Sequence, residues 1–332
     1  MGKSFSTLND ISVTRSKSPF LRATEKMIQK TESEPRLGGS SGRRFILWGE
    51  QTSQVYEEID IHCTMHDGKP LFAAKRDGKW FAVWGDLESQ KYDYVRSPSV
   101  YGGKLLFKAT HKGKWFVVLG DQEGEVYDSV SSLSVHDGKL LFAAERDGKW
   151  FAVWGDQMSE EHAYVGGLSV HDGKLLFAAE RDGKSFIVWG DQKSGWYDSV
   201  YFHSVHDGKL LFAAKRDGKW FAVWGDAESG KYSEVGGLSV HDGKLLFAAK
   251  RRKTFVVWGK QTSRRYDEVY CCSIHEGKPL FIAESNEKRY VVWGKYESDV
   301  YNSCSKLKSN EDGFTFIANK NGQYYEVIVK TK

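Results

Sequence analysis

The chain is poor in proline and in cysteine. Of its 332 residues, 5 are proline and 4 are cysteine. The cysteines form no C-x-x-C pair and no spacing typical of zinc ligands; they are Cys63, Cys271, Cys272 and Cys304. The sequence therefore predicts reduced thiols in a cytoplasmic protein, without a disulfide framework or a metal site.

Long apolar runs and a strong charge imbalance are also missing. No segment approaches the roughly 18 apolar residues of a membrane-spanning helix, and residues 1–13 lack the apolar core of a signal peptide. The formal net charge of +4 is too small to indicate nucleic acid or a membrane as a partner. Met1–Ser6 does fit the myristoylation pattern M-G-x-x-x-[ST], which leaves lipidation of Gly2 open.

Aromatic residues and glycine are abundant instead. Phe, Trp and Tyr make up 14% of the chain, and there are 34 glycines. Many aromatics and glycines with little proline are typical of short strands joined by tight turns. The composition thus favours an all-β fold.

A Trp-Gly pair recurs along the chain at a nearly fixed spacing of 34 to 36 residues. The pairs begin at Trp48, Trp84, Trp154, Trp189, Trp224, Trp258 and Trp293, and Leu119 fills the one gap. A constant period of this length marks a protein built from structural repeats.

The unit that begins at Tyr127 shows the pattern within each repeat. It contains four segments with apolar residues: 127–130, 133–136, 140–146 and 150–156. Asp137-Gly138 and Asp147-Gly148 are strong hairpin signals, because a type I′ turn needs positive φ at both central residues. Each unit is therefore predicted to be an antiparallel four-stranded meander, whose fourth strand carries the tyrosine, as in residues 231–235.

The two longer segments of each unit are apolar on both faces, so the sheets must be covered on both sides. A row of such sheets, each packed between its neighbours, is a β-propeller or an open stack. Residues 136–156, "HDGKLLFAAERDGKWFAVWGD", are similar to WD-repeat and bacterial TolB-like propeller repeats. The resemblance implies a propeller but carries over no functional residue, because Trp-Gly-Asp stands where WD repeats have Trp-Asp.

The two ends of the chain complement each other. Residues 324–329 match the third strand of a ninth unit, and no fourth strand follows them. Ser4–Val13 align with Val126–Val135, which span the fourth strand of one unit and the first strand of the next. We expect Ser4–Leu8 to lie beside residues 324–329 and to complete the last blade. This predicts one closed, nine-bladed β-propeller domain over residues 3–330; the alternative is eight blades, with the residues before about 43 outside the ring.

The first unit contains an insertion. Residues 18–24 and 43–49 fit its second and third strands, and residues 25–43 form a polar insertion between them. Within it, residues 38–42 match G-x-S-x-G, but a nucleophile elbow requires a strand before it and a helix after it. We interpret this stretch as a flexible loop.

Three repeated residue types are candidates for ligand contact. We expect the tryptophans of the Trp-Gly pairs to pack between blades, and the fourth-strand tyrosines to lie nearer the rim, where a partner would reach them. Histidines before the first Asp-Gly turn would be too far apart for one metal ion and are predicted to stabilise turns or face solvent; they are His66, His136, His171, His206, His241 and His275.

One unit has a distinctive charge pattern. Residues 250–255, "KRRKTF", replace an Asp-Gly turn. The candidate partner-binding residues are the cations at and near this turn: Arg251, Arg252, Lys253, Arg264 and Arg265. Such a cluster binds phosphate or an acidic partner, or is simply a solvated edge.

Near-identical units argue against catalysis, because a catalytic site needs different residues in different roles at one place. No P-loop, G-x-G-x-x-G or H-E-x-x-H motif occurs, so no cofactor is expected. The sequence predicts a monomeric, non-catalytic binding scaffold for a protein partner. A multivalent glycan-binding propeller is the alternative, and a recently amplified or engineered repeat protein without an evolved ligand stays open.

Overall fold

A computed structural model describes residues 11–17 and 35–331. All regular secondary structure in these residues is β-strand. The chain divides into two compact units, one of residues 25–196 and one that joins residues 1–24 to 197–332. The all-β expectation is confirmed. The expectations for Gly2, Ser4–Leu8 and residues 18–24 concern segments outside the described residues.

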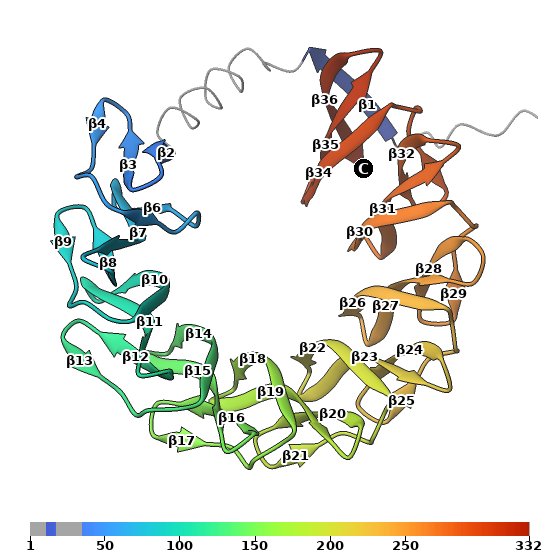
Figure 1. Ribbon diagram of the computed structural model, residues 1–332. Coiled ribbons are helices and arrows are strands. Elements are labelled where there is room, and N and C mark those ends of the chain that lie inside the picture. Colours follow the sequence, from blue (N-terminus) through green and yellow to red (C-terminus); the bar gives the residue numbers. More distant parts are fainter. Residues whose placement is uncertain (1–10, 18–34, 332) are drawn as a thin grey trace, which may run out of the picture. The chain divides into compact units, whose positions relative to one another are not determined.

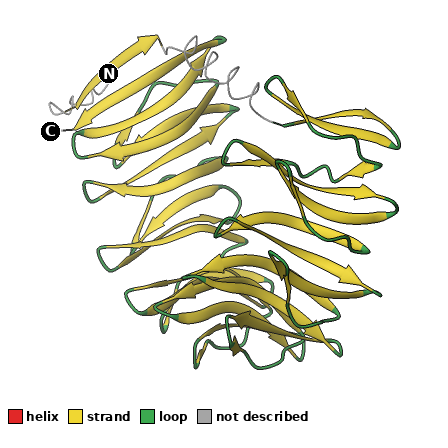
Figure 2. Ribbon diagram, turned by 90° about the vertical axis from the view of Figure 1, so that its left-hand side faces the viewer, coloured by secondary structure: helices red, strands yellow, loops and turns green. Residues whose placement is uncertain are grey.

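Nine antiparallel sheets, called blades 1 to 9 in chain order, repeat one meander (Figures 1 and 2). Blades 1–5 belong to the 25–196 unit and blades 6–9 to the other. The first strand of blade 2 has two pieces, β5 (Glu58–Ile59) and β6 (Thr64–His66). The first strands of blades 3–9 are β10 (Tyr94–Tyr101), β14 (Ser129–His136), β18 (Tyr164–His171), β22 (Ser199–His206), β26 (Glu234–His241), β30 (Glu268–His275) and β34 (Ser303–Asn310).

The second and third strands form the apolar hairpin of each blade. The second strands are β2 (Arg36–Ser40), β7 (Lys69–Arg76), β11 (Lys104–His111), β15 (Lys139–Arg146), β19 (Lys174–Arg181), β23 (Lys209–Arg216), β27 (Lys244–Lys250), β31 (Lys278–Ser285) and β35 (Gly313–Lys320). The third strands are β3 (Arg43–Trp48), β8 (Lys79–Trp84), β12 (Lys114–Leu119), β16 (Lys149–Trp154), β20 (Lys184–Trp189), β24 (Lys219–Trp224), β28 (Thr254–Trp258), β32 (Lys288–Trp293) and β36 (Gln323–Thr331).

The Asp-Gly pairs make the predicted hairpin turns. Asp137 and Gly138 between β14 and β15 have φ of 47° and 77°, and Asp147 and Gly148 between β15 and β16 have φ of 51° and 73°. Both central residues of each turn are thus left-handed, as a type I′ turn requires.

The fourth strand is shorter than expected. In blades 1–8 it has two residues directly after the Trp-Gly or Leu-Gly turn: β4 (Gln51–Thr52), β9 (Leu87–Glu88), β13 (Gln122–Glu123), β17 (Gln157–Met158), β21 (Gln192–Lys193), β25 (Ala227–Glu228), β29 (Gln261–Thr262) and β33 (Tyr296–Glu297). The predicted strand at residues 231–235 is split, because Tyr232 bridges back to Trp220 of its own blade while Glu234 already begins β26 of the next. A bulge between Gly236 and Ser239 keeps β26 in one piece.

Blade 9 is completed by the N-terminal strand. β1 (Ile11–Lys17) pairs antiparallel with β36, from Ile11 opposite Thr331 to Lys17 opposite Tyr325. Blades 1 and 9 each have their own third strand, so the expected count of nine and the completion of the last blade are confirmed. The pairing segment is Ile11–Lys17, and the closure of all blades into one ring stays a prediction, as does the single domain over residues 3–330.

Blade 1 differs from the expectation. Within the described residues it has three strands, and its second strand is β2, which pairs with β3 from Arg36 opposite Leu47 to Ser40 opposite Arg43. β2 lies inside the stretch interpreted as a polar insertion, and Gly38–Gly42 form a hairpin rather than a flexible loop. The tight Ser41-Gly42 turn, with φ of 78° at Gly42, makes this register available to the chain.

The core consists of layers between consecutive blades of each unit. Phenylalanines of one blade pack against small residues of the preceding blade, with Phe107 and Phe116 of blade 3 in one buried cluster with Ala73 and Ala82 of blade 2. Phe247 and Phe255 of blade 7 contact Ala213 and Ala222 of blade 6 in the same way. In these two layers a bulky face packs on a flat face, and blades inside each unit are buried between two neighbours, as the apolar pattern of their hairpins predicts.

Removal of β1 tests how blade 9 is completed. Deleting residues 1–17 leaves β36 as an unpaired edge, so we expect the melting temperature to fall by about 5 °C or more and the protein to aggregate on heating. Circular dichroism melts and light scattering measure both effects. Deleting residues 1–10 is the matched control, because it retains β1; an equal loss of stability in the two deletions would contradict the assignment of the pairing to Ile11–Lys17.

Candidate functional site

An aromatic cluster repeats at the interface between consecutive blades. The tyrosine after the fourth strand lies with its ring against two aromatic residues of the next blade, as Tyr56 does at 5.7 Å from Phe72 and 5.8 Å from Phe81. Tyr127 is 5.9 Å from both Phe142 and Phe151. Edge-to-face pairs of this kind stabilise the interface beyond the apolar area that they bury.

The expectation that these tyrosines are available to a partner is wrong. They are buried, from Tyr266 at 1% exposed to Tyr232 at 8%. Their backbone bridges to the third strand of their own blade, which directs the ring into the next blade. Only the hydroxyl reaches the rim, where that of Tyr127 donates to Glu125 Oε2 at 3.3 Å.

The tryptophans of the Trp-Gly pairs are packing residues, as predicted. Trp84 Nε1 donates to the carbonyl oxygen of His66 at 3.0 Å, and Lys69 Nζ lies 5.3 Å from the ring centroid. The same two contacts recur at Trp154, Trp189, Trp224 and Trp293. Because a lysine covers each ring, these tryptophans are poor platforms for sugar stacking.

Grooves open beside these layers, at the edge formed by the fourth strands. Three are well defined: about 510 Å³ between blades 3 and 4, about 450 Å³ between blades 4 and 5, and about 670 Å³ between blades 6 and 7. In each, the segment from the fourth strand to the tyrosine position forms one wall, and the second and third strands of the next blade, with the turn that follows them, form the other. The site thus repeats, with the differences between blades in its walls.

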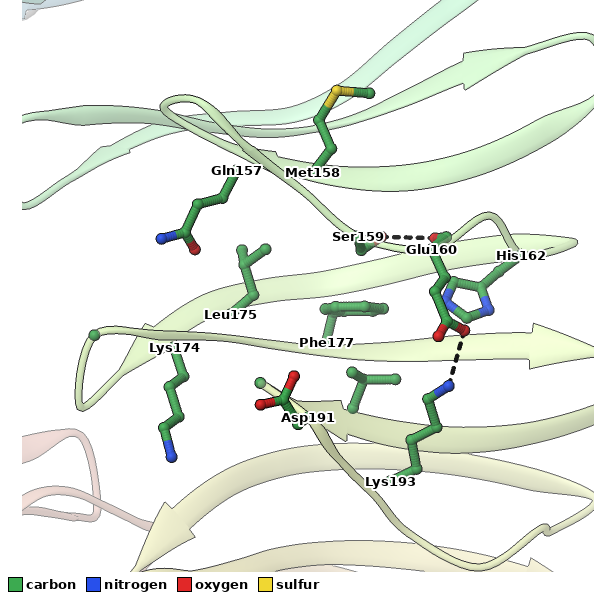
Figure 3. A pocket seen from close by; sticks show the side chains of 13 residues that line it. Gln157, Met158, Ser159, Glu160, His162, Lys174, Leu175, Phe177, Asp191 and Lys193 are labelled. Atoms are coloured by element: carbon green, nitrogen blue, oxygen red, sulfur yellow. Dashed lines mark hydrogen bonds and ion pairs between the residues drawn. The ribbon is translucent and has the colours of Figure 1, made fainter.

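Figure 3 shows the groove between blades 4 and 5. Leu175 and Phe177 lie in its middle, and polar side chains lie at both ends. At one end, Lys193 Nζ donates to Glu160 Oε2 at 2.8 Å, and this bond holds the pKa of Glu160 below its ordinary value. The charges there are paired with each other.

His162 distinguishes this groove, since it replaces the tyrosine found at the other interfaces. Its ring lies 5.9 Å from Phe177 and 5.5 Å from Phe186, so it occupies the tyrosine position. The side chain is 2% exposed, and its Nδ1 has no hydrogen-bond partner among the described residues. Burial, and then the charge of Arg181, lower the pKa of His162 below 6.5, which favours the neutral imidazole.

The groove between blades 6 and 7 contains the second buried polar atom without a partner within residues 35–331. Trp258 Nε1 donates to no acceptor there, although Lys244 Nζ covers the ring at 4.6 Å. The five tryptophans described above all bond to a histidine carbonyl. The two buried polar atoms without a partner, His162 Nδ1 and Trp258 Nε1, therefore both belong to residues that line grooves.

The structure places Arg251, Arg252 and Lys253 on the turn between β27 and β28, and all three are exposed. Arg251 Cζ lies 5.3 Å from the Tyr232 ring, and Arg265 Cζ lies 6.0 Å from the adjacent Phe255 ring. Lys253 Nζ forms an ion pair with Asp267 Oδ1 at 3.0 Å. Arg251 and Arg265 thus lie over one aromatic pair, whose ring centroids are 5.8 Å apart.

Arg264 has a packing role that its position in the sequence did not indicate. In blades 2 and 6, an arginine at the end of the second strand lies over the aromatic cluster and pairs with a fourth-strand glutamate, as Arg216 does with Glu228 at 3.0 Å. Blade 8 has Ser285 at that position. Arg264 supplies the missing guanidinium: it lies 5.3 Å from the Tyr266 ring and pairs with Glu297 Oε1 at 2.7 Å.

The cysteines and histidines form no cluster in the part of the chain that the structure describes. No group of three His, Cys, Asp or Glu residues there is placed to hold a metal ion. All four cysteines are free, and burial raises the pKa of the Cys63, Cys272 and Cys304 thiols to about 12, which keeps them protonated at neutral pH. The same residues include no helix with the length and apolarity needed to cross a membrane.

The packing role of Arg264 predicts a stability effect. Arg264→Ala removes the ion pair with Glu297 and uncovers two tyrosine rings, so we expect the free energy of unfolding to fall by about 1 kcal/mol. Arg252→Ala, at the exposed turn, is the matched control and is expected to leave it unchanged. Urea denaturation measures both; an unchanged stability of Arg264→Ala would show that the guanidinium does not support blade 8.

The buried His162 predicts a pH effect. The unfolded chain binds a proton at this residue near pH 6.5, but the folded protein does so only at lower pH, so protonation favours unfolding as the pH falls below about 6.5. Glu160 opposes this shift, and Arg181 and Lys193 add to it. His162→Tyr removes the titration, so melting temperatures of the two proteins measured from pH 7.5 to 5 should diverge, with the wild type losing more. Parallel curves would contradict a buried neutral imidazole.

Comparison with known proteins adds little to these observations. No family model and no curated protein matches the chain. Among solved structures, the β-propeller domain of the Trilobed protease from Pyrococcus furiosus is 15% identical, with coverage of 80% of this chain and 97% of that one and a TM-score of 0.32. Apo AztD from Citrobacter koseri is 8% identical, with coverage of 89% and 96% and a TM-score of 0.34. BBS1N in complex with ARL6DN is 10% identical, with coverage of 90% and 96% and a TM-score of 0.30. These values assign the chain to no family, and the repeated four-stranded blades rest on the structure itself.

Proposed function

We propose that the protein is a non-catalytic binding scaffold, and that blade 7 receives an acidic segment of a protein partner. The contact surface consists of Arg251, Arg252 and Arg265, with Lys253 and Arg264 beside them. This surface is called the cationic rim below.

One observation carries the proposal: Arg251, Arg252 and Arg265 of the cationic rim lack the carboxylates that neutralise arginines of other blades. Arg76 pairs with Glu88 at 2.9 Å and Arg216 pairs with Glu228 at 3.0 Å, both on two-residue fourth strands. Blade 7 has Thr262 in place of that glutamate. Among the described residues, no carboxylate forms an ion pair with Arg251, Arg252 or Arg265.

The arrangement favours an external anion. Arg251 and Arg265 lie over the same Tyr232–Phe255 pair, so their like charges are held near each other without a counter-ion from the blade. A guanidinium binds a carboxylate through two parallel hydrogen bonds, and a flexible acidic segment can bring several carboxylates to one rim. The planar donors are exposed, so the partner needs no rearrangement of the blade.

The rest of the proposal follows from the repeat. A catalytic site combines an acid, a base and a nucleophile at one place. Blades with the same residues in the same places do not provide such a combination, which supports binding rather than catalysis. The modest net charge of +4 argues for a local acidic contact rather than for nucleic acid or a membrane. We propose a cytoplasmic monomer.

Binding of an acidic probe tests this function. We expect fluorescein-labelled decaglutamate to bind the wild-type protein at low ionic strength, with an affinity that falls as salt is added. Arg251→Ala/Arg252→Ala/Arg265→Ala should weaken binding at least tenfold, about 1.4 kcal/mol at 25 °C. Fluorescence anisotropy gives both values.

The control removes three positive charges from other blades. Lys149→Ala/Lys219→Ala/Lys288→Ala changes the net charge equally and should lower the affinity less than twofold. Equal losses in the two triple variants would reduce the effect to net charge. Failure of the wild type to bind the probe would reject an acidic partner, and binding on a glycan array would then favour the multivalent glycan alternative, for which the repeated grooves provide the sites.

A further inference from the structure

We propose a second, separate binding site in the groove between blades 4 and 5, which takes a small neutral molecule with an aromatic ring and one hydroxyl group, held through His162. This site lies in the 25–196 unit, and the cationic rim lies in the other. The two proposals therefore fail independently.

The buried Nδ1 of His162 is the first argument. A polar atom removed from water without a hydrogen bond costs free energy, so such atoms are rare in folded proteins. The imidazole lines the groove and its ring lies beside Glu160 (Figure 3). A turn of the ring toward the groove would bring this nitrogen to a ligand bound there and give it a partner.

The second argument is what the other interfaces have in this place. A tyrosine there brings a ring and a hydroxyl to the rim, as Tyr127 does toward Glu125. His162 keeps the contact with both phenylalanines, but it is a shorter side chain and brings no hydroxyl to the rim. The groove between blades 4 and 5 thus lacks a hydroxyl that the repeat normally provides.

The chemistry of the lining selects the class of ligand. Leu175, Phe177 and Val188 offer an apolar surface to a ring. At the end of the groove where His162 lies, Glu160 is already paired with Lys193 at 2.8 Å and Arg181 at 3.6 Å, so the charges nearest the imidazole are satisfied; Lys174 and Asp191 lie at the other end. A hydroxyl both donates and accepts, so it satisfies Nδ1 in either tautomer of a neutral imidazole.

NMR titration with p-cresol tests the site. We expect the Cε1–Hε1 signal of His162, identified by its absence from His162→Phe, to shift and saturate in the millimolar range or below. Toluene has the ring without the hydroxyl and should bind at least tenfold more weakly. Equal binding of the two compounds, or shifts elsewhere that leave His162 unmoved, would overturn the proposal.

Two reciprocal variants complete the test. His162→Tyr installs the residue that the repeat tolerates at this position, so it should fold and should lose cresol binding; His162→Phe repeats the test without a hydroxyl. Tyr127→His makes the same change in the groove between blades 3 and 4 and should create a second cresol site there. Undiminished binding by both His162 variants would exclude this residue. The Arg251→Ala/Arg252→Ala/Arg265→Ala protein should bind cresol like the wild type.

Discussion

The packing of a bulky face against a flat face holds every other feature in place. Phenylalanines on one blade pack against smaller side chains of the preceding one, alanines in three of the layers, because two faces of phenylalanine would separate the sheets and two flat faces would leave a cavity. Burial of each phenylalanine contributes ~1.5–3 kcal/mol. A period of 34 to 36 residues repeats this pair between blades 2 and 3, 4 and 5, and 6 and 7, whereas Ile282 and Val291 of blade 8 stand in place of the alanines next to blade 9. The tyrosine adds a third ring to the layer and ties the fourth-strand segment to it.

This constraint explains where differences between blades accumulate. The interface residues cannot change singly without a cavity or a clash, whereas the groove walls and the rims have fewer neighbours. The Arg251–Lys253 turn is a change of that kind, whereas His162 is a change inside the buried layer that keeps the ring contacts with Phe177 and Phe186. Both changes leave the packing of the layer in place and alter only the polar contacts. At His162 the tyrosine hydroxyl is gone and Nδ1 has no partner among the described residues. In blade 7 the arginines lack the fourth-strand glutamate that pairs with an arginine in blades 2 and 6. Local loss of a repeated hydrogen bond or ion pair is what makes one blade different from its copies.

Much of the fold could be predicted from the sequence, because the repeat shows the same rule many times. The Asp-Gly turns and the apolar faces follow from local patterns, and the alignment predicted that an N-terminal strand completes blade 9, but it did not identify Ile11–Lys17 as that strand. The tyrosines were misplaced, because an isolated bridge to the third strand is a backbone contact that hydropathy does not show. Gly38–Gly42 were misread since their composition resembles a linker. For the sites, the cluster of cations in blade 7 could be recognised in the sequence. The sequence did not show that Arg264 takes over the packing role of the second-strand arginine, which blade 8 lacks because it has Ser285 there, since this depends on contacts between blades. His162 stands in the sequence where other units have tyrosine, but its burial and its unpaired nitrogen come only from the structure.

The pairing of β1 with β36 also sets an order of events during synthesis. The first strand leaves the ribosome long before its partner exists, while the blades between them can form one after another as the chain emerges. Blade 9 is consequently the last sheet to be completed, and until translation reaches β36 the N-terminal segment has to be kept from joining the open side of some other nascent sheet. Near-identical neighbours make that error easy, so a long strand in a register of seven residue pairs, rather than two, gives the correct partner an advantage over every incorrect one.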